Sequence, residues 1–465
     1  MSRTDEERGV ATPEEGGANE SPTRVPPRAN PDGQTPGPEW AWVDPTIWTP
    51  RMVQALRSGV KGGVWYTLWD KIHTPRALAS AFAKVKANGG APGIDRVTVE
   101  AFERDKERHL KELGEALAAG TYRPTAIRRC YIPKGGSKEL RPLGIPTVKD
   151  RVVQTALRAA LEPIYEREFA EHSYGFRPGR NAHQAIDRVE RLLCEGNKWV
   201  VDLDLKSYFD TVPHAPLMAL VRGRVADGRV LAMVETFLKQ PVDEEGRRWS
   251  PIVGTPQGAV ISPLLANLYL NSLDHHMAGL GFEMTRYADD LVVQCRSEED
   301  ARRALTEITR WCGSAVLTVH PVKTRVVQVS TTEGFDFLGY HFREHRDDPR
   351  RVKKWPREKS VAKLRDTLRP LTRRKNGDSL EWIIRRANIV LRGFFQYFSK
   401  SVTTPLREID SWVRGRLRAI LRTRRKRRGR ATVRDNQRWP NAYFAKLGLF
   451  SLVRIPAPAM HSPSG

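Results

Sequence analysis

Four aspartates in two strand-forming segments are the side chains of this chain that are best suited to do chemistry. Residues 199–205 alternate apolar and acidic positions, which predicts a strand that presents Asp202 and Asp204 on one face. Residues 282–295 predict a hairpin whose turn carries Asp289 and Asp290. Acidic residues are depleted from strands, so their presence in two such segments indicates a function.

Carboxylates that converge from a strand and a hairpin tip could hold hard divalent cations. Mg²⁺ prefers carboxylate oxygens and leaves positions open for phosphate. Two such ions, about 3.5–4 Å apart, stabilise the attacking and the leaving oxygen of an in-line phosphoryl displacement. The alternative is that these residues are solvent-facing turn and edge-strand acids. Either segment alone leaves the two interpretations about equal, because a bare Asp-Asp dipeptide is common.

Periodicity and capping patterns predict the elements around these acids. Apolar positions between residues 78 and 85 indicate a helix, and Asn181 with Gln184 forms a capping box that opens another. Residues 130–147 are predicted to be extended and rich in turns. Beyond residue 340, three amphipathic stripes, the last opening at Thr404-Pro405, predict a small helical bundle.

Charge is distributed unevenly along the 465 residues, whose net charge is +24. Residues 341–440 hold 31 Lys and Arg against 10 Asp and Glu, which predicts contact with a polyanion such as nucleic acid. The densest run consists of Arg422, Arg424, Arg425, Lys426, Arg427, Arg428 and Arg430. For this run a solvated flexible tail is as good an interpretation as a fixed RNA groove, and ordering upon RNA binding would combine the two.

Composition also excludes several classes of protein. No apolar run approaches the roughly 18 residues that a membrane span requires. The four cysteines form no CxxC pair, which argues against a disulfide framework or a cysteine zinc site and favours reduced cytosolic thiols. Residues 1–50 contain nine prolines and no regular period, and they are interpreted as a disordered leader, with order expected from about Trp65 to Trp69.

Several motifs, in order along the chain, resemble those of reverse transcriptases. Tyr287-Ala288-Asp289-Asp290 resembles their signature, residues 204–210 resemble their first catalytic motif, and residues 254–267 resemble the nucleotide-binding loop and helix. Residues 141–146, 173–180, 335–340 and 391–398 are similar to segments of the group II intron reverse transcriptases and maturases. The resemblance covers roughly residues 65–455.

The resemblance implies an α+β right-hand polymerase fold followed by an all-α domain. The expected division is a leader over 1–62, fingers over 63–197, a palm with an antiparallel sheet over 198–342, a basic helical thumb or maturase domain over 343–456, and a tail over 457–465.

The resemblance also implies roles for individual residues. Asp204, Asp289 and Asp290, with the backbone of Leu205, would ligate two Mg²⁺ ions, and Lys323 would act as a general acid near the leaving pyrophosphate. Lys134 and Arg141 would hold the triphosphate. Phe209 would stack beneath the sugar and exclude a 2′-hydroxyl, while Gln257 and Gly258 would lie near the nucleotide and the template base.

The implied activity is RNA-directed DNA synthesis that copies a group II intron RNA, from a DNA 3′ end, during retrohoming. The expected partners are intron RNA, DNA target or primer, and deoxynucleoside triphosphates, in a bacterial cytoplasmic ribonucleoprotein. Two alternatives stay open: a splicing maturase that binds intron RNA, and a related reverse transcriptase recruited to a host task. No endonuclease domain is expected, because paired cysteines are absent after Leu449.

Overall fold

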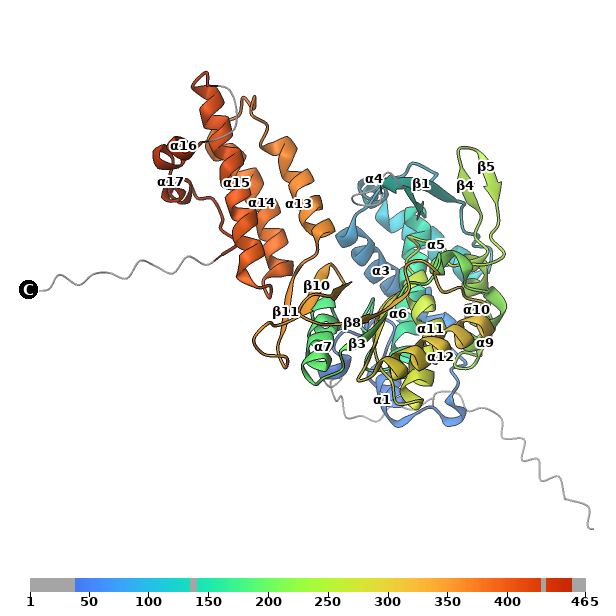
Figure 1. Ribbon diagram of the computed structural model, residues 1–465. Helices are drawn as coiled ribbons and strands as arrows, with labels where there is room; N and C mark the ends of the chain where they lie inside the picture. Colours follow the sequence, from blue (N-terminus) through green and yellow to red (C-terminus); the bar gives the residue numbers. More distant parts are fainter. Residues whose placement is uncertain (1–37, 134–139, 428–431, 454–465) are drawn as a thin grey trace, which may run out of the picture.

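The segment around residues 199–205 forms an inner strand of an antiparallel sheet in the computed structural model, which describes residues 38–133, 140–427 and 432–453 (Figure 1). This central sheet has four strands in the order β6-β7-β3-β8. Their bounds are β3 (Trp199–Leu203), β6 (Glu283–Tyr287), β7 (Asp290–Cys295) and β8 (Arg325–Gln328). The hairpin predicted over residues 282–295 is therefore confirmed as β6 and β7.

Both faces of the central sheet are covered by helices. On one face Val201 and Leu203 pack into a large core that includes α11 (Ser262–Gly279) and α12 (Glu298–Ser314). On the other face Val200 packs with α7 (Ala182–Cys194), which opens with the predicted capping box. Strand β3 thus has apolar residues on both faces. On the face that carries the acids, α7 covers the part near Val200, so the acids lie toward the carboxyl end of the strand.

The folded structure begins well before the expected end of the leader. The 3₁₀ turns η1 (Pro38–Trp40) and η2 (Lys61–Gly63) flank α1 (Pro50–Ser58). Ile47, Trp48 and Leu56 are buried in the large core, and the Trp48 indole donates a hydrogen bond to the carbonyl of Ala159 at 2.9 Å. The expectation of a disordered leader over 1–62 is therefore corrected for residues 38–62. Apolar residues dispersed among the prolines of this segment pack into the large core. Residues 1–37 lie outside the described residues.

Helices and a second sheet complete the larger part of the molecule. The helices are α2 (Trp69–Ile72), α3 (Pro75–Asn88), α4 (Val99–Arg104), α5 (Lys106–Ala118), α6 (Val148–Glu166), α8 (Tyr208–Thr211), α9 (His214–Arg222) and α10 (Gly228–Leu238). The second sheet has the order β2-β1-β4-β5. Its strands are β1 (Ile127–Pro133), β2 (Leu140–Ile145), β4 (Val242–Glu244) and β5 (Arg247–Trp249). Residues 134–139, between β1 and β2, lie outside the described residues.

The C-terminal part is a three-stranded antiparallel sheet followed by helices that stand apart from the main body in Figure 1. The elements are β9 (Gly334–Phe337), β10 (Tyr340–Glu344), β11 (Val352–Pro356), α13 (Glu358–Leu371), α14 (Leu380–Phe398), α15 (Thr403–Arg424), α16 (Val433–Arg438) and α17 (Asn441–Lys446). The three predicted helices are confirmed as α13 to α15. The N-cap of α15 is Val402, and Thr404-Pro405 lies in the first turn.

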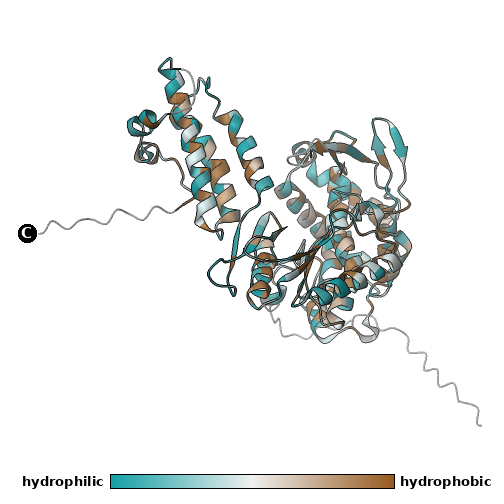
Figure 2. Cartoon of the chain, in the orientation of Figure 1, coloured by the Kyte–Doolittle hydropathy of each residue, from teal (hydrophilic) through white to brown (hydrophobic). Residues whose placement is uncertain are grey.

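The helices α13 to α15 bury their apolar stripes against one another, and their outer faces are hydrophilic (Figure 2). A buried lysine joins the small sheet to the main body. The Lys354 ammonium contacts the carboxylates of Glu190 at 2.6 Å and Asp187 at 3.5 Å, both on α7. In addition, the Tyr340 hydroxyl donates to the Tyr397 carbonyl at 2.6 Å, so β10 is fixed to α14. Within the described residues no helix is long and apolar enough to cross a bilayer.

Trp48→Ala tests whether residues before 63 belong to the core. The loss of a buried indole and its hydrogen bond should lower the free energy of unfolding by about 3–5 kcal/mol. Urea denaturation followed by circular dichroism measures this change. The matched control is Trp382→Ala, whose indole is on α14 and is 43% exposed, and which should cost much less. Equal effects of the two substitutions would contradict the assignment of Trp48 to the core.

Candidate active site

The register of the central sheet brings two predicted acids together from positions far apart in the sequence. Leu203 pairs with Leu291 across β3 and β7, and continuation of this register sets Asp204 opposite Asp290. Both acids line a cleft of about 420 Å³, together with Lys323 and Arg357. Arg357 precedes α13, so the cleft lies where the central sheet meets the C-terminal part.

The hairpin that carries Asp289 and Asp290 is anchored from within by Arg286, whose side chain is fully buried. Its Nε donates to Asp274 Oδ1 at 2.7 Å, and a second nitrogen contacts the other oxygen of that carboxylate. The remaining nitrogen donates to Asn267 Oδ1 and to the carbonyl of Ala288, both at 2.9 Å. Because a buried guanidinium must have all its donors paired, these partners fix the backbone at the hairpin turn.

Residues 173–175 run alongside β6 and support the outer edge of the same hairpin. Tyr174 donates from its backbone to Arg286 at 2.9 Å, and Asn267 donates to the carbonyl of Gly175 at 2.7 Å. A Cβ on Gly175 would lie 2.3 Å from the backbone nitrogen of Ala288. Only glycine allows this approach, so the segment and the turn are in direct backbone contact. Ala288 itself has a positive φ of 59°, as a tight turn requires.

Electrostatic conditions at the turn oppose ionisation of its carboxyls. Desolvation, followed by the negative charges of Asp289 and Asp204, raises the pKa of Asp290 to about 6, even though its side chain reaches solvent. Desolvation also raises the pKa of Asp289; Asp204 adds to this rise, while Arg141 and Arg286 oppose it. A cation among these carboxylates would relieve their mutual repulsion.

Asp204 and Asp202 make different ion pairs. The Lys323 ammonium lies 3.2 Å from the Asp204 carboxylate, and the backbone amide of His320 donates to the Asp204 carbonyl at 2.8 Å. Asp202 instead pairs with Arg325 at 3.2 Å. Leu205 bridges to Val319 on the neighbouring segment, and its side chain is buried. Lys323 therefore occupies the same cleft as the acids, where it neutralises one of them.

Carboxylate oxygens from Asp204, Asp289 and Asp290 are the donor type that a hard divalent cation selects, and the raised pKa values fit a site that a cation would neutralise. Within the described residues, however, no three His, Cys, Asp or Glu side chains converge closely enough to form a metal-binding group. Asp204 and Asp290 share the cleft, and Asp289 is the adjacent residue of the turn.

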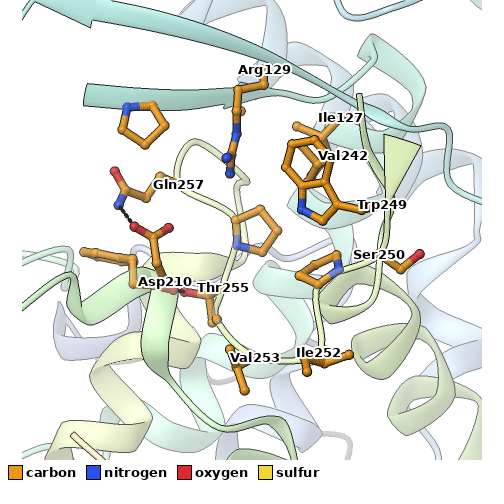
Figure 3. Close-up of a pocket in the computed structure, with 16 residues that line it drawn as sticks. Ile127, Arg129, Asp210, Val242, Trp249, Ser250, Ile252, Val253, Thr255 and Gln257 are labelled. Atoms are coloured by element: carbon orange, nitrogen blue, oxygen red, sulfur yellow. Dashed lines mark hydrogen bonds between the residues drawn. The ribbon is translucent and has the colours of Figure 1, made fainter. Parts of the chain in front are cut away.

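A second cavity, of about 370 Å³, lies between the second sheet, α8 and the segment 250–257 (Figure 3). Phe209, Gln257, Arg129 and Trp249 are among the residues that line it. The Arg129 guanidinium lies over the Trp249 ring, with its carbon 5.0 Å from the ring centre. Phe209 is largely buried, so it is both a core residue and part of the cavity wall. Loop 254–258 is pinned to α8, since the Thr255 amide donates to the Phe209 carbonyl at 2.6 Å.

The predicted nucleotide-binding residues meet at this loop. Arg141 on β2 donates through Nε to Gln257 Oε1 at 3.0 Å. The Gly144 amide donates to the Gln257 carbonyl at 2.6 Å, and a Cβ on Gly258 would lie 2.2 Å from the Gly144 carbonyl oxygen. Gly258 is therefore required for the contact between loop and strand. Lys134 lies outside the described residues.

The basic run is partly built into the fold at the end of α15. Arg422 pairs with Asp435 at 2.8 Å, Arg424 contacts the carbonyl of Asp378, and the Arg425 guanidinium carbon lies 5.5 Å from the ring centre of Trp439. Lys426 and Arg427 are exposed. Arg428 and Arg430 lie outside the described residues. The first three residues of the run thus have structural partners, so this part of the run is not a flexible tail.

Sequence patterns did not single out Arg286, Asp274 or Arg357. Arg286 sits in a strand where an arginine usually faces solvent, and its partners Asn267 and Asp274 are on α11. Their spacing of seven residues, which is two helical turns, is a signal that they share a face of the helix. Nothing local indicated that this face would meet β6.

Comparison with known proteins is consistent with this geometry. The family described as "Reverse transcriptase (RNA-dependent DNA polymerase)" matches residues 132–342, and "Group II intron, maturase-specific domain" matches residues 361–439. Protein YkfC of Escherichia coli (strain K12) is 33% identical over 365 residues, which cover 69% of this chain and 91% of that protein.

Two further relatives are much longer than their matched region. Group II intron-encoded protein LtrA of Lactococcus lactis subsp. cremoris is 36% identical over 49% of this chain, but the match spans only 38% of LtrA. An uncharacterized 91 kDa protein in the cob intron of Schizosaccharomyces pombe is 28% identical over 69% of this chain and 49% of its own length. A chain of the partial Cas6-RT-Cas1–Cas2 complex aligns over 53% of this chain and 42% of its own at 22% identity, with a TM-score of 0.34.

Arg286→Lys tests the anchoring of the hairpin. Lysine keeps the charge but loses the fork that pairs with Asp274, Asn267 and the Ala288 carbonyl, so the free energy of opening this region should fall by about 2 kcal/mol or more. Hydrogen exchange over residues 283–295 measures the opening. Arg302→Lys, at a 70% exposed position on α12, is the matched control and should leave the exchange unchanged. Unaltered protection in Arg286→Lys would show that the turn is held by other contacts.

Proposed function

Because the chain belongs to the family of group II intron-encoded reverse transcriptases and maturases, we propose that it copies intron RNA into DNA from a DNA 3′ end during retrohoming. The observation that carries the proposal is the pairing of β3 with β7, which sets Asp204 opposite Asp290 in a cleft next to Asp289. Membership of the family makes the chain an RNA-directed DNA polymerase that binds group II intron RNA. Retrohoming, the primer and the deoxynucleoside triphosphates are parts of the proposal.

Asp204, Asp289 and Asp290 are the residues that would hold divalent metal ions, with the backbone of Leu205 as a further oxygen donor. Reverse transcriptases as a family use divalent metal ions; two Mg²⁺ ions are proposed here. When bound, such ions supply charge stabilisation to the attacking and leaving oxygens of nucleotidyl transfer. The support from the chain is the donor type and the raised pKa of Asp289 and Asp290.

Lys323 is proposed to give a proton to the leaving pyrophosphate. Its ammonium already lies in the acidic cleft, 3.2 Å from Asp204, and it is 58% exposed, so it can turn toward a bound triphosphate. Arg141 is proposed to hold the triphosphate oxygens, since its guanidinium offers a fork and its positive charge reaches Asp289. Lys134, which follows β1, is proposed as a second phosphate ligand.

Phe209 is proposed to contact the sugar of the incoming nucleotide, and Gln257 and Gly258 to border the nucleotide and the template base. Phe209 lines the cavity beside loop 254–258, although the residue is mostly buried. A rigid ring at this position would leave no room for a 2′-hydroxyl. The backbone contacts of Gly144 and Thr255 support this role by fixing the loop.

The proposed division is fingers over 63–197, extended by residues 38–62, a palm over 198–342, and a thumb or maturase domain over 343–456. The palm boundaries enclose the central sheet with its acids, and the maturase-specific match at 361–439 falls within the third segment. Intron RNA is proposed to lie along the helical segment, with Arg422, Arg424, Arg425, Lys426, Arg427, Arg428 and Arg430 among the residues that contact its phosphates, as in a splicing ribonucleoprotein.

Asp289→Ala tests the polymerase proposal. The purified protein should extend a DNA primer on an RNA template with Mg²⁺, whereas Asp289→Ala should lose at least about 100-fold in rate because a metal ligand is gone. RNA affinity, measured by filter binding, should stay within twofold. Asp347→Ala, at an 82% exposed position, is the matched control. A wild type that binds intron RNA tightly but extends no primer would favour the splicing maturase alone.

Salt dependence tests the RNA-binding proposal. Each lost phosphate contact removes about 0.7–0.9 from the slope of log K against log salt, so Lys426→Ala with Arg427→Ala should flatten it by about 1–2. Arg422→Ala should behave differently and also lower the melting temperature, because it breaks the pair with Asp435. A slope unchanged in the double variant would return the exposed part of the run to the solvated-tail interpretation.

A further inference from the structure

An acid that the proposed chemistry does not use ends a chain of hydrogen bonds in the second cavity. Asp210, on α8, accepts from Gln257 Nε2 at 3.1 Å (Figure 3). Gln257 Oε1 in turn accepts from Arg141 Nε at 3.0 Å. The three side chains come from α8, the 254–258 loop and β2, so one short chain joins three elements of the site.

The chemistry of these groups fixes the direction of the chain. A carboxylate can only accept hydrogen bonds, and a guanidinium can only donate them. Between the two, the Gln257 amide has one arrangement that satisfies both neighbours: its NH₂ group toward Asp210 and its oxygen toward Arg141. Without Asp210 the amide could rotate by half a turn and present its NH₂ group to Arg141, where two donors would face each other.

Asp210 is itself held firmly. Its amide donates to the Ser207 carbonyl at 2.8 Å, and a Cβ on Gly254 would lie 2.8 Å from the Asp210 carbonyl oxygen. Because Gly254 and Thr255 donate to carbonyls on either side of Asp210, the carboxylate and the loop that carries Gln257 form one unit. This unit cannot shift without breaking backbone hydrogen bonds.

Nearby cations compensate the charge that Asp210 brings close to a proposed triphosphate site. Partial burial raises the pKa of Asp210, and the charges of Arg129 and Arg141, together with the Gln257 hydrogen bond, oppose this rise. Arg129 is held in place over the Trp249 ring. An acid beside a polyanion site would repel the ligand, so its presence between two arginines indicates a task other than contact with the ligand.

We propose that Asp210 is a positioning residue for the incoming nucleotide: it fixes the orientation of the Gln257 amide, which in turn aims the Arg141 guanidinium at the triphosphate. Asp210 touches neither the nucleotide nor a metal ion in this role. The inference rests on the proposed polymerase function, and it adds a residue that acts only through Arg141.

Steady-state primer extension on an RNA template separates this role from a structural one. Asp210→Ala should raise KM for the deoxynucleoside triphosphate about 5–10-fold, the value of one ordinary hydrogen bond, and leave kcat within about twofold. Asp210→Asn keeps an acceptor oxygen and should restore KM to within about twofold of wild type. Asp105→Ala, at a 60% exposed position, is the matched control.

A double-variant cycle tests the route through Arg141. In an Arg141→Ala background, Asp210→Ala should raise KM by less than about twofold, because the residue on which it acts is gone. The full effect in that background, or a fall in kcat with unchanged KM, would overturn the proposal. If Asp210→Ala melts at a much lower temperature, Gln257→Glu provides a second variant. It should weaken nucleotide binding, because two carboxylates then face each other. Adding Asp210→Asn should restore binding, because the introduced amide then donates to the introduced carboxylate.

Nucleotide binding without turnover keeps this test separate from that of the polymerase. A labelled deoxynucleoside triphosphate is titrated onto protein with annealed template and primer, with Ca²⁺ in place of Mg²⁺. The same ratios between variants are expected even if the wild type extends no primer, an outcome that would count against the proposed function alone. Equal binding by wild type and Asp210→Ala would count against the positioning role alone.

Discussion

The buried ion pair between Arg286 and Asp274 is the interaction on which the rest of the site depends. Both side chains are fully buried, and such a pair is retained only where each donor and acceptor is satisfied. Here the guanidinium also donates hydrogen bonds to Asn267 and to the carbonyl of Ala288. These hydrogen bonds offset the cost of burying the charge, and they fix the backbone of the turn. The turn that carries the two acids is thus held by an arginine whose carboxylate partner is Asp274.

The pairing register of β3 and β7 brings Asp204 next to the turn that Arg286 anchors. A slip of one residue between β3 and β7 would send every side chain of one strand to the opposite face. Val201 and Val200 pack into different cores on the two sides of the sheet, so neither face can exchange with the other. Asp204 is consequently held opposite Asp290, at the one end of the strand that α7 leaves uncovered.

Patterns with a short range along the chain were sufficient to predict much of this arrangement. The alternation at 199–205, the hairpin at 282–295 and the capping box at Asn181 all correspond to observed elements, because each rests on a local period or a cap. The same local patterns predicted that Asp204 would converge with the hairpin acids, and Asp204 and Asp290 do line one cleft. Features that arise only from tertiary packing were missed: the core position of Trp48, the reach of Arg286 across to α11, and the chain from Asp210 to Arg141. No window of sequence carries the information that these segments meet.

Metal binding tests the central claim, that Asp204 and the hairpin acids form one site, more directly than any measurement of turnover. Mn²⁺ titrated onto the full chain and followed by electron paramagnetic resonance should be bound by the wild type. Binding should weaken at least about tenfold in Asp204→Asn and in Asp289→Asn alike, as expected for ligands of the same ion. The two substitutions together should weaken binding further than either alone, because the ion then loses two ligands. A variant of either residue that binds Mn²⁺ as the wild type does would contradict a shared site.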